Sequence, residues 1–204
     1  MNFDGDFEID DVTVEEVWLA LSDPYMIKTA LPGCEFLVRV DEEDVDFEQL
    51  RTEMTDRAAD PPILPEATPE DVAERAFEEG GRYATLLELS VGSVKPSFES
   101  VVVITEREFP RMRTSGEGSA ASSSFELSAG MELAETDTGV VVEWAAEADV
   151  FGRIAQLGGR VINPVANRVV HQFFDDVADR LNEVGDAEAT DDRENLRDRV
   201  RRLL

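Results

Sequence analysis

The feature that most constrains the fold is a change of hydrophobic period near residue 150. Before it, alternate residues are apolar, as in a half-buried strand: Val140, Val142, Trp144, Ala146, Ala148 and Val150. After it, apolar residues recur every three to four positions, the spacing of a helix face: Ile154, Gly158, Val161, Val165, Val169, Phe173, Val177 and Leu181. A helix over about 152–184 would be roughly 50 Å long. Its apolar stripe needs an equally long partner, which predicts a sheet wrapped along it around an enclosed apolar space.

The earlier residues supply that sheet. A strand begins at Phe3, and a short helix begins at the capping box of Thr13 and Glu16. Asp23-Pro24 opens a second short helix, and period-two patterning then recurs in five segments, from Cys34, Tyr83, Phe98, Met112 and Phe125, before the strand that follows Gly139. Short links between consecutive strands favour antiparallel pairing. The prediction is an α+β fold, with seven antiparallel strands and two short helices after strand 1.

Residues 43–80 interrupt this pattern. Phe47, Leu50 and Met54 have helical spacing, three prolines follow, and Thr68-Pro69 is a good helix start. So long a link between two strands is often a lid or binding loop, although a surface decoration without function is the alternative. We therefore predict one domain over 1–184 with an insert at about 43–80, and then a polar linker and a short basic segment over 185–204.

Composition restricts the function. The chain has 46 acidic and 19 basic residues and a net charge of −27. Because the acidity is spread along the whole chain, it favours a protein that works in concentrated salt over one with an acidic surface for a particular partner. Nucleic-acid binding, which needs clustered Lys and Arg, is not expected. The single cysteine rules out an intramolecular disulfide and a cysteine-based zinc site, and no metal is predicted.

Targeting signals are not evident either. Acidic residues interrupt the first apolar positions, and no apolar run is long enough to span a bilayer. We expect a cytoplasmic protein. Its last residues form a basic amphipathic stripe that could bring it peripherally to the inner face of the cell membrane or to an acidic partner, with a solvated terminus as the alternative. The arginines of this stripe are Arg193, Arg197, Arg199, Arg201 and Arg202.

The residues predicted to line the enclosed space share an inward position on the strands or the long helix. They are Phe36, Leu87, Phe98, Met112, Thr114, Met131, Trp144, Ile154, Leu157 and Val161. A filled core is the alternative for each of them. Gly116 and Gly118 lack side chains on the inner face and so favour open space. Gly158, Gly159 and Pro164 weaken or bend the helix, which fits either a hinge that opens the cavity or a fixed kink.

The sequence offers few candidates for catalytic residues. His171 lies off the apolar stripe and has no Ser or Cys at a recognisable spacing. Cys34 follows a Pro-Gly turn, where packing is the favoured role over nucleophilic chemistry. No catalytic residue is predicted.

Several short motifs carry a family resemblance. They are Phe3-Asp4-Gly5-Asp6-Phe7, Glu16-Val17-Trp18, Leu21-Ser22-Asp23-Pro24, Leu31-Pro32-Gly33-Cys34-Glu35, Val91-Gly92 leading to Phe98, and Val150 to Gly158 running into Phe173-Phe174. The element order resembles the helix-grip fold of the START, polyketide cyclase and Bet v 1-like pollen-allergen proteins (the SRPBCC superfamily). Within it, the motifs resemble the CoxG family of carbon monoxide dehydrogenase subunits over about 2–42 and 81–181. The 43–80 insert departs from the compact family pattern.

The resemblance implies a non-catalytic accessory subunit of a carbon monoxide dehydrogenase-type molybdenum hydroxylase. It implies a lipid-like ligand, with a quinone as a noncovalently bound cofactor, and a link between the enzyme and the membrane. A small-molecule cyclase or hydrolase of the polyketide cyclase type is the enzymatic alternative. A maturation chaperone that binds no small molecule is the third.

Overall fold

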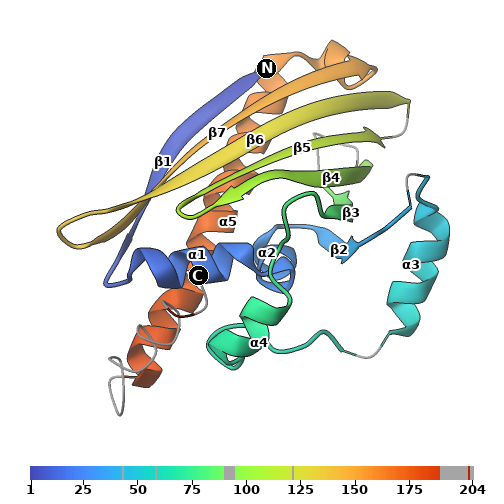
Figure 1. Cartoon of the computed structure of the whole chain (residues 1–204). Coiled ribbons are helices and arrows are strands. Elements are labelled where there is room, and N and C mark those ends of the chain that lie inside the picture. Colours follow the sequence, from blue (N-terminus) through green and yellow to red (C-terminus); the bar gives the residue numbers. More distant parts are fainter. Residues whose placement is uncertain (43, 58, 90–94, 121, 189–201, 203–204) are drawn as a thin grey trace.

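The computed structural model describes residues 1–42, 44–57, 59–89, 95–120, 122–188 and 202 (Figure 1). The N-terminal elements are β1 (Asn2–Asp10), α1 (Val14–Ser22), α2 (Pro24–Ala30) and β2 (Cys34–Arg39). The insert forms α3 (Phe47–Asp56) and α4 (Pro69–Glu74). The rest of the chain forms β3 (Arg82–Glu88), β4 (Ser97–Glu108), β5 (Arg111–Ala120), β6 (Ser123–Glu135), β7 (Gly139–Gly152), a 3₁₀ turn η1 (Ala155–Leu157) and α5 (Gly159–Glu188).

The sheet has the predicted architecture. Its seven strands are all antiparallel and lie in the order β1-β7-β6-β5-β4-β3-β2, so that β1 and β2 are the edges. The long strands pass over α5, and α1 and α2 lie toward the C-terminal part of that helix (Figure 1). This confirms the helix-grip fold expected from the order of the elements.

Side-chain caps fix the ends of the short helices. The Thr13 hydroxyl accepts from the Glu16 backbone N–H at 3.3 Å, and the Glu16 carboxylate accepts from the Thr13 N–H at 2.7 Å, which completes the predicted capping box of α1. Asp23 caps α2 by accepting from the Tyr25 N–H at 3.0 Å. Thr68 and Asp71 form the same kind of box at α4, which ends at Glu74.

The start of the long helix differs from the prediction. Strand β7 continues to Gly152, and α5 begins only at Gly159, after η1. Gly158 separates the two with φ 67° and ψ 168°, a conformation that is essentially restricted to glycine. A continuous helix from about 152 is therefore wrong. At the other end the helix runs to Glu188, past the predicted end at 184.

The insert covers two surfaces. Helix α3 packs Phe47, Leu50 and Met54 onto Phe36 and other apolar side chains of β2 and β3, on the face of the sheet opposite α5. The second part of the insert instead enters the main core, where it buries Ile63, Leu64, Ala67, Val72 and Phe77. The insert is thus an integral part of the folded domain, and the alternative of a surface decoration does not describe it.

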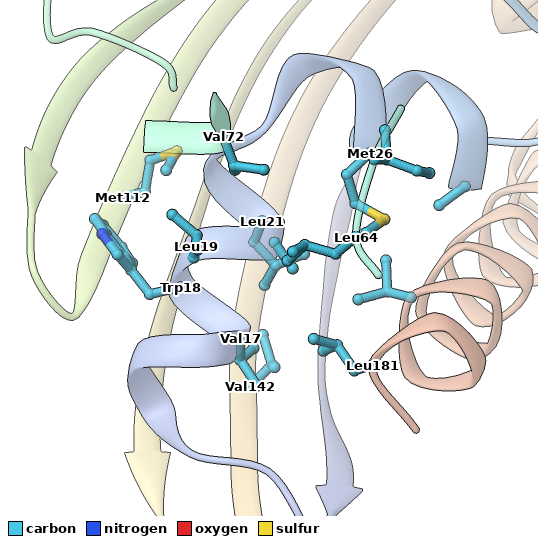
Figure 2. Close-up of a cluster of buried hydrophobic side chains, with 14 of the residues drawn as sticks. Val17, Trp18, Leu19, Leu21, Met26, Leu64, Val72, Met112, Val142 and Leu181 are labelled. Atoms are coloured by element: carbon cyan, nitrogen blue, oxygen red, sulfur yellow. The ribbon is translucent and has the colours of Figure 1, made fainter. Parts of the chain in front are cut away.

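The main core occupies one end of the molecule. Val17, Trp18, Leu19 and Leu21 of α1 lie between the strands and the C-terminal part of α5, together with residues from α2, the insert, β5, β7 and α5 (Figure 2). Each of the labelled side chains in this cluster is at most 5% exposed. This end of the helix grip is therefore closed.

Candidate functional site: the apolar inner face of the sheet

The register of the strands defines which residues face α5. Directly paired residues share a face, and Ile104, Met112, Met131 and Trp144 pack in or against the core under α1 and α5. The same alternation places a set of mostly apolar residues on this inner face of β4–β7: Phe98, Ser100, Val102, Ile104, Met112, Thr114, Gly116, Gly118, Phe125, Leu127, Ala129, Met131, Trp144, Ala146, Ala148 and Val150. None of these positions carries a carboxylate or a histidine.

Burial along this face changes from one end to the other. On β6, Leu133 is buried in the core, whereas Leu127 and Phe125 are only half-buried. On β7, Val142 is buried, whereas Val150 is half-buried. The inner face is therefore covered at the α1 end and incompletely covered at the other. We call this second region the open half, defined on the sheet by Phe98, Phe125, Leu127, Ala129, Ala148 and Val150.

Helix α5 shows the matching change. Phe174, Val177 and Leu181, in its C-terminal part, are buried in the core. In its first three turns the inward apolar residues are only half-buried: Ile162, Val165, Ala166 and Val169. Two apolar surfaces thus face each other in the open half without the close packing that buries both at the closed end. Such an arrangement suits an apolar ligand with few polar contacts.

Most of the predicted lining residues lie on the inner face. Leu87, Phe98, Met112, Thr114, Met131 and Trp144 all point inward. Met112 is a core residue at the closed end, 5% exposed, and Phe98 belongs to the open half. Phe125, Leu127 and Val150 were missing from the predicted set, although the same alternation along their strands would have identified them.

Phe36 was placed on the wrong face. It pairs with Leu86 and packs under α3, on the outer side of the sheet. A register shift between Cys34 and Phe36 moves the strand out of simple alternation, so Cys34 and Phe36 do not share a face as period-two counting requires. Leu37 takes the inward position instead and is 8% exposed.

The predicted lining residues beyond β7 lie at its junction with α5. Ile154 is half-buried, and its N–H donates to Ser123 Oγ at 2.9 Å. Leu157 and Val161 are 42% and 38% exposed. They are not enclosed because the helix does not begin at 152, so the spacing counted from Ile154 does not describe one helical face.

Gly116 and Gly118 do not leave open space as predicted. A Cβ at Gly118 would lie 2.6 Å from the Phe125 ring and 2.3 Å from the Glu99 carbonyl oxygen. The Phe125 ring therefore occupies the volume that the glycine vacates, and it packs edge-on against Phe98 with ring centroids 6.0 Å apart. The missing side chain at Gly118 therefore makes room for the Phe125 ring on the inner face.

A few polar groups face inward near this surface. Thr85 and Ser100 are paired across β3 and β4, and each is 4% exposed. Among the described residues, the Thr85 hydroxyl has no hydrogen-bond partner, which is unusual for a buried polar atom. Trp144 lies opposite Gly5, where a Cβ would meet the indole Nε1 at 3.2 Å, and its ring is 6.5 Å from that of Phe174.

Cys34 is protected from nucleophilic chemistry. Burial raises the pKa of its thiol to about 12, and the Sγ donates to the Phe36 carbonyl at 3.4 Å. We expect iodoacetamide at pH 8 to alkylate Cys34 in the folded protein roughly 1,000-fold more slowly than a free cysteine, because the thiolate is the reactive form. The rate should reach the free-cysteine value in denaturant and should rise with pH. Equal rates in folded and unfolded protein would contradict the raised pKa.

The remaining site candidates are easily placed. His171 is exposed on α5, away from the buried stripe. In the part of the chain that the structure describes, no group of three or more His, Cys, Asp or Glu side chains could hold a metal ion. Arg193, Arg197, Arg199 and Arg201 lie outside the described residues, and Arg202 is exposed. No helix within the described ranges is both long and apolar enough to cross a membrane.

Solved structures with the same fold extend over nearly the whole chain. A conserved protein from Geobacillus kaustophilus is 19% identical, with a TM-score of 0.65 over 90% of this chain and 96% of its own. Ara h 8.0201 is 10% identical, with a TM-score of 0.55 over 90% of this chain and 98% of its own. The Zhui aromatase/cyclase from Streptomyces sp. R1128 is 10% identical, with a TM-score of 0.53 over 89% of this chain and 93% of its own. At these identities the likeness shows the fold alone.

Sequence comparison identifies the family. No protein of curated function matches the chain. The family model for the CoxG subunit of carbon monoxide dehydrogenase matches residues 74–182, which include β3 to β7, η1 and most of α5. This span contains the inner face of β4–β7 and the facing part of α5. The chain therefore belongs to the CoxG family of carbon monoxide dehydrogenase subunits.

Proposed function

We propose that this protein is a non-catalytic accessory subunit of a carbon monoxide dehydrogenase-type molybdenum hydroxylase. It holds a hydrophobic ligand, a quinone or another lipid, between the sheet and α5, and it links the enzyme to the membrane. The observation that carries the proposal is the open half, where apolar residues of the sheet and of α5 face each other and remain only half-buried. The family match supports the dehydrogenase as the partner.

Burial supplies the binding energy in this proposal. Each CH₂-sized group of a prenyl chain gains about 0.8 kcal/mol when it leaves water. A long chain on the open half therefore needs few polar contacts. The unpartnered Thr85 hydroxyl and the neighbouring Ser100 are the groups we assign to an oxygen of the ligand, because a buried hydroxyl gains a hydrogen bond there that it otherwise lacks among the described residues.

The enzymatic alternative is a cyclase or hydrolase of the polyketide cyclase type. Its support is the fold shared with the Zhui aromatase/cyclase. An enzyme of this kind needs acid and base groups that converge on the substrate. Apart from Glu135, which is exposed at the end of β6, the inward positions of β4–β7 carry hydroxyl groups at Ser100, Thr114 and Ser123 and the Arg107 guanidinium, but neither carboxylate nor imidazole. This chemistry favours a carrier over a catalyst.

Native mass spectrometry with lipid extraction tests the proposal, on protein purified from its own host at high salt. We expect a quinone or other lipid to co-purify and to leave on unfolding. Ala148→Trp, which places a large side chain on the open half, should lower the occupancy, and Ala145→Trp on the outer face of the same strand is its control. An empty protein that still captures the dehydrogenase would contradict the ligand and leave recruitment or maturation as the role.

The proposed hinge lies at the start of α5 and is formed by Gly158, just before the helix, and by Gly159 and Pro164 in its first two turns. Replacing both glycines with alanine should slow ligand exchange, because alanine at Gly158 disfavours φ 67° and restricts the junction. Stopped-flow transfer of a fluorescent lipid measures the rate. Gly159→Ala alone is the control, since its Cβ would be 3.4 Å from Asn163 in ordinary contact. Exchange at the wild-type rate in the double variant would indicate a fixed kink.

A further inference from the structure

The junction between β7 and α5 differs in charge from the rest of the chain. Acidic residues make up 46 of the 204 residues, so a stretch as long as 150–174 would contain about five or six of them on average. It contains none, and it includes Arg153, Arg160 and Arg168. All three arginines are exposed, and none has a carboxylate within ion-pair distance among the described residues.

The same segment concentrates exposed apolar side chains. Four large hydrophobic residues are exposed in the part of the chain that the structure describes, and three of them lie here: Phe151 at 54%, Leu157 at 42% and Val161 at 38%. The fourth, Phe109, lies between β4 and β5 and packs its ring edge-on against Trp18. Exposed apolar residues that cluster in this way are typical of an interaction surface.

The apolar and basic residues share one side of the helix. Arg160, Pro164 and Arg168 are four residues apart, Val161 precedes Pro164 by three, and all four are exposed. The half-buried residues Ile162, Val165 and Val169 occupy the inward side of the same turns. Helix α5 thus begins as an amphipathic segment whose outward side carries arginines, apolar residues and the amides of Asn163 and Asn167, but no carboxylate, beside the open half of the sheet.

We propose that this junction surface, formed by Arg153, Leu157, Arg160, Val161 and Arg168, docks on an anionic lipid bilayer. The arginines would contact lipid phosphates while the apolar side chains enter the interfacial region. The charge favours this occupant, because a segment without carboxylates avoids the repulsion that the rest of this acidic chain meets at an anionic surface. Phe151 is not part of this surface: it lies on the outer face of β7, beside a hollow lined by Glu117 and Glu126, where the acidic surface resumes.

This inference rests on the proposed function. The place of the junction surface in the fold explains how docking would serve that function. The junction connects the last strand to the half of α5 that faces the open half. Docking here would bring the apolar space of the protein next to the bilayer, where a lipid-like ligand can transfer without crossing water. This segment of the sequence also differs from the C-terminal segment, whose arginines are predicted to contact a membrane or a partner.

Vesicle co-sedimentation of the full-length protein tests the surface. The probes are phosphatidylglycerol–phosphatidylcholine vesicles and pure phosphatidylcholine vesicles, at low and at molar salt. Replacing Arg153, Arg160 and Arg168 with glutamine should weaken partitioning to the anionic vesicles at low salt by about 100-fold, at roughly 1 kcal/mol for each arginine. Replacing Leu157 and Val161 with serine should weaken it at both salt concentrations, because burial of apolar surface is not screened.

A matched control separates the surface from overall charge. Glutamine at Arg39, Arg111 and Arg113, which are also exposed, changes the net charge equally and should alter partitioning by less than about threefold. An equal loss in the two arginine triples would overturn the proposal. So would wild-type protein that binds neither kind of vesicle. Loss of binding only on deletion of 190–204, with the arginine triple and the serine double unaffected, would assign the membrane contact to the C-terminal segment instead.

Two further measurements distinguish this inference from the carrier function and from self-association. The junction variants should keep their co-purified lipid in native mass spectrometry, since the changes lie outside the inner face. A protein that binds vesicles through the junction but contains no lipid would retain the docking surface and contradict the carrier. Light scattering that shows a wild-type dimer, and a monomer for the serine double, would mean that a second copy covers the surface and would overturn the proposal.

Discussion

Replacing Arg75 with alanine should lower the free energy of unfolding by about 3–5 kcal/mol, because it removes one partner of a buried ion pair. The guanidinium donates to both carboxylate oxygens of Asp23, at 3.0 and 2.6 Å, and to the Pro62 carbonyl at 2.8 Å. The Asp23 side chain is 1% exposed, so its carboxylate depends on these contacts in place of water. Arg75 also lies over the Tyr25 ring at 5.0 Å and so anchors the end of the insert to α2.

The matched control is Arg39→Ala. Arg39 also pairs with a carboxylate, Glu78 at 2.7 Å, but the two side chains are 52% and 62% exposed. Solvent screens such a pair, and its loss should cost about 0–1 kcal/mol. Urea unfolding of both variants in the same salt gives the comparison. If the two variants lose the same free energy of unfolding within experimental error, the buried pair does not hold the insert in place.

Leu181→Ala and Leu127→Ala should differ strongly although the substitution is the same. Leu181 lies in the closed end and is 2% exposed, so truncation leaves a cavity and should cost about 2–5 kcal/mol. Leu127 lies in the open half and is half-buried, so its truncation should cost about 1 kcal/mol. The expected functional effect has the opposite order, because only Leu127 faces the proposed ligand.

Urea unfolding and lipid occupancy measured on the same two proteins check this pair of expectations. Thermal unfolding with and without extracted lipid adds a third measurement, since a ligand bound to the native state should raise the midpoint of wild type and less that of Leu127→Ala. Equal destabilisation by the two substitutions would mean that the open half is packed as tightly as the core. That result would favour a filled domain and the maturation role.

Local rules predicted most of the secondary structure. Thr13 with Glu16 and Thr68 with Pro69 signalled helix starts through nearest-neighbour chemistry that the structure reproduces. The alternation along β6 and β7 predicted their inward residues, because the two faces of a strand follow from a period of two. The order of these elements was enough to infer a helix-grip fold.

Other features depend on neighbours distant in the sequence. Phe36 faces α3 because a register shift against β3 changes its side of the strand, and alternation within one strand does not reveal such a shift. Gly118 is filled by Phe125 from the adjacent strand, so the glycine alone did not indicate space. The helix begins at Gly159 because Gly158 adopts a positive φ, which hydrophobic spacing does not encode.

The sequence by itself determined the seven strands, the two capped helices, the long C-terminal helix and the family. Each of these follows from short-range periodicity, from caps or from motifs contained within a few residues. Only the tertiary structure decided that the core closes at one end and not at the other, that the insert supplies part of this core, and that the acid-free junction is exposed beside the open half. Burial is a property of the surfaces that pack together, and those surfaces come from segments far apart in the chain.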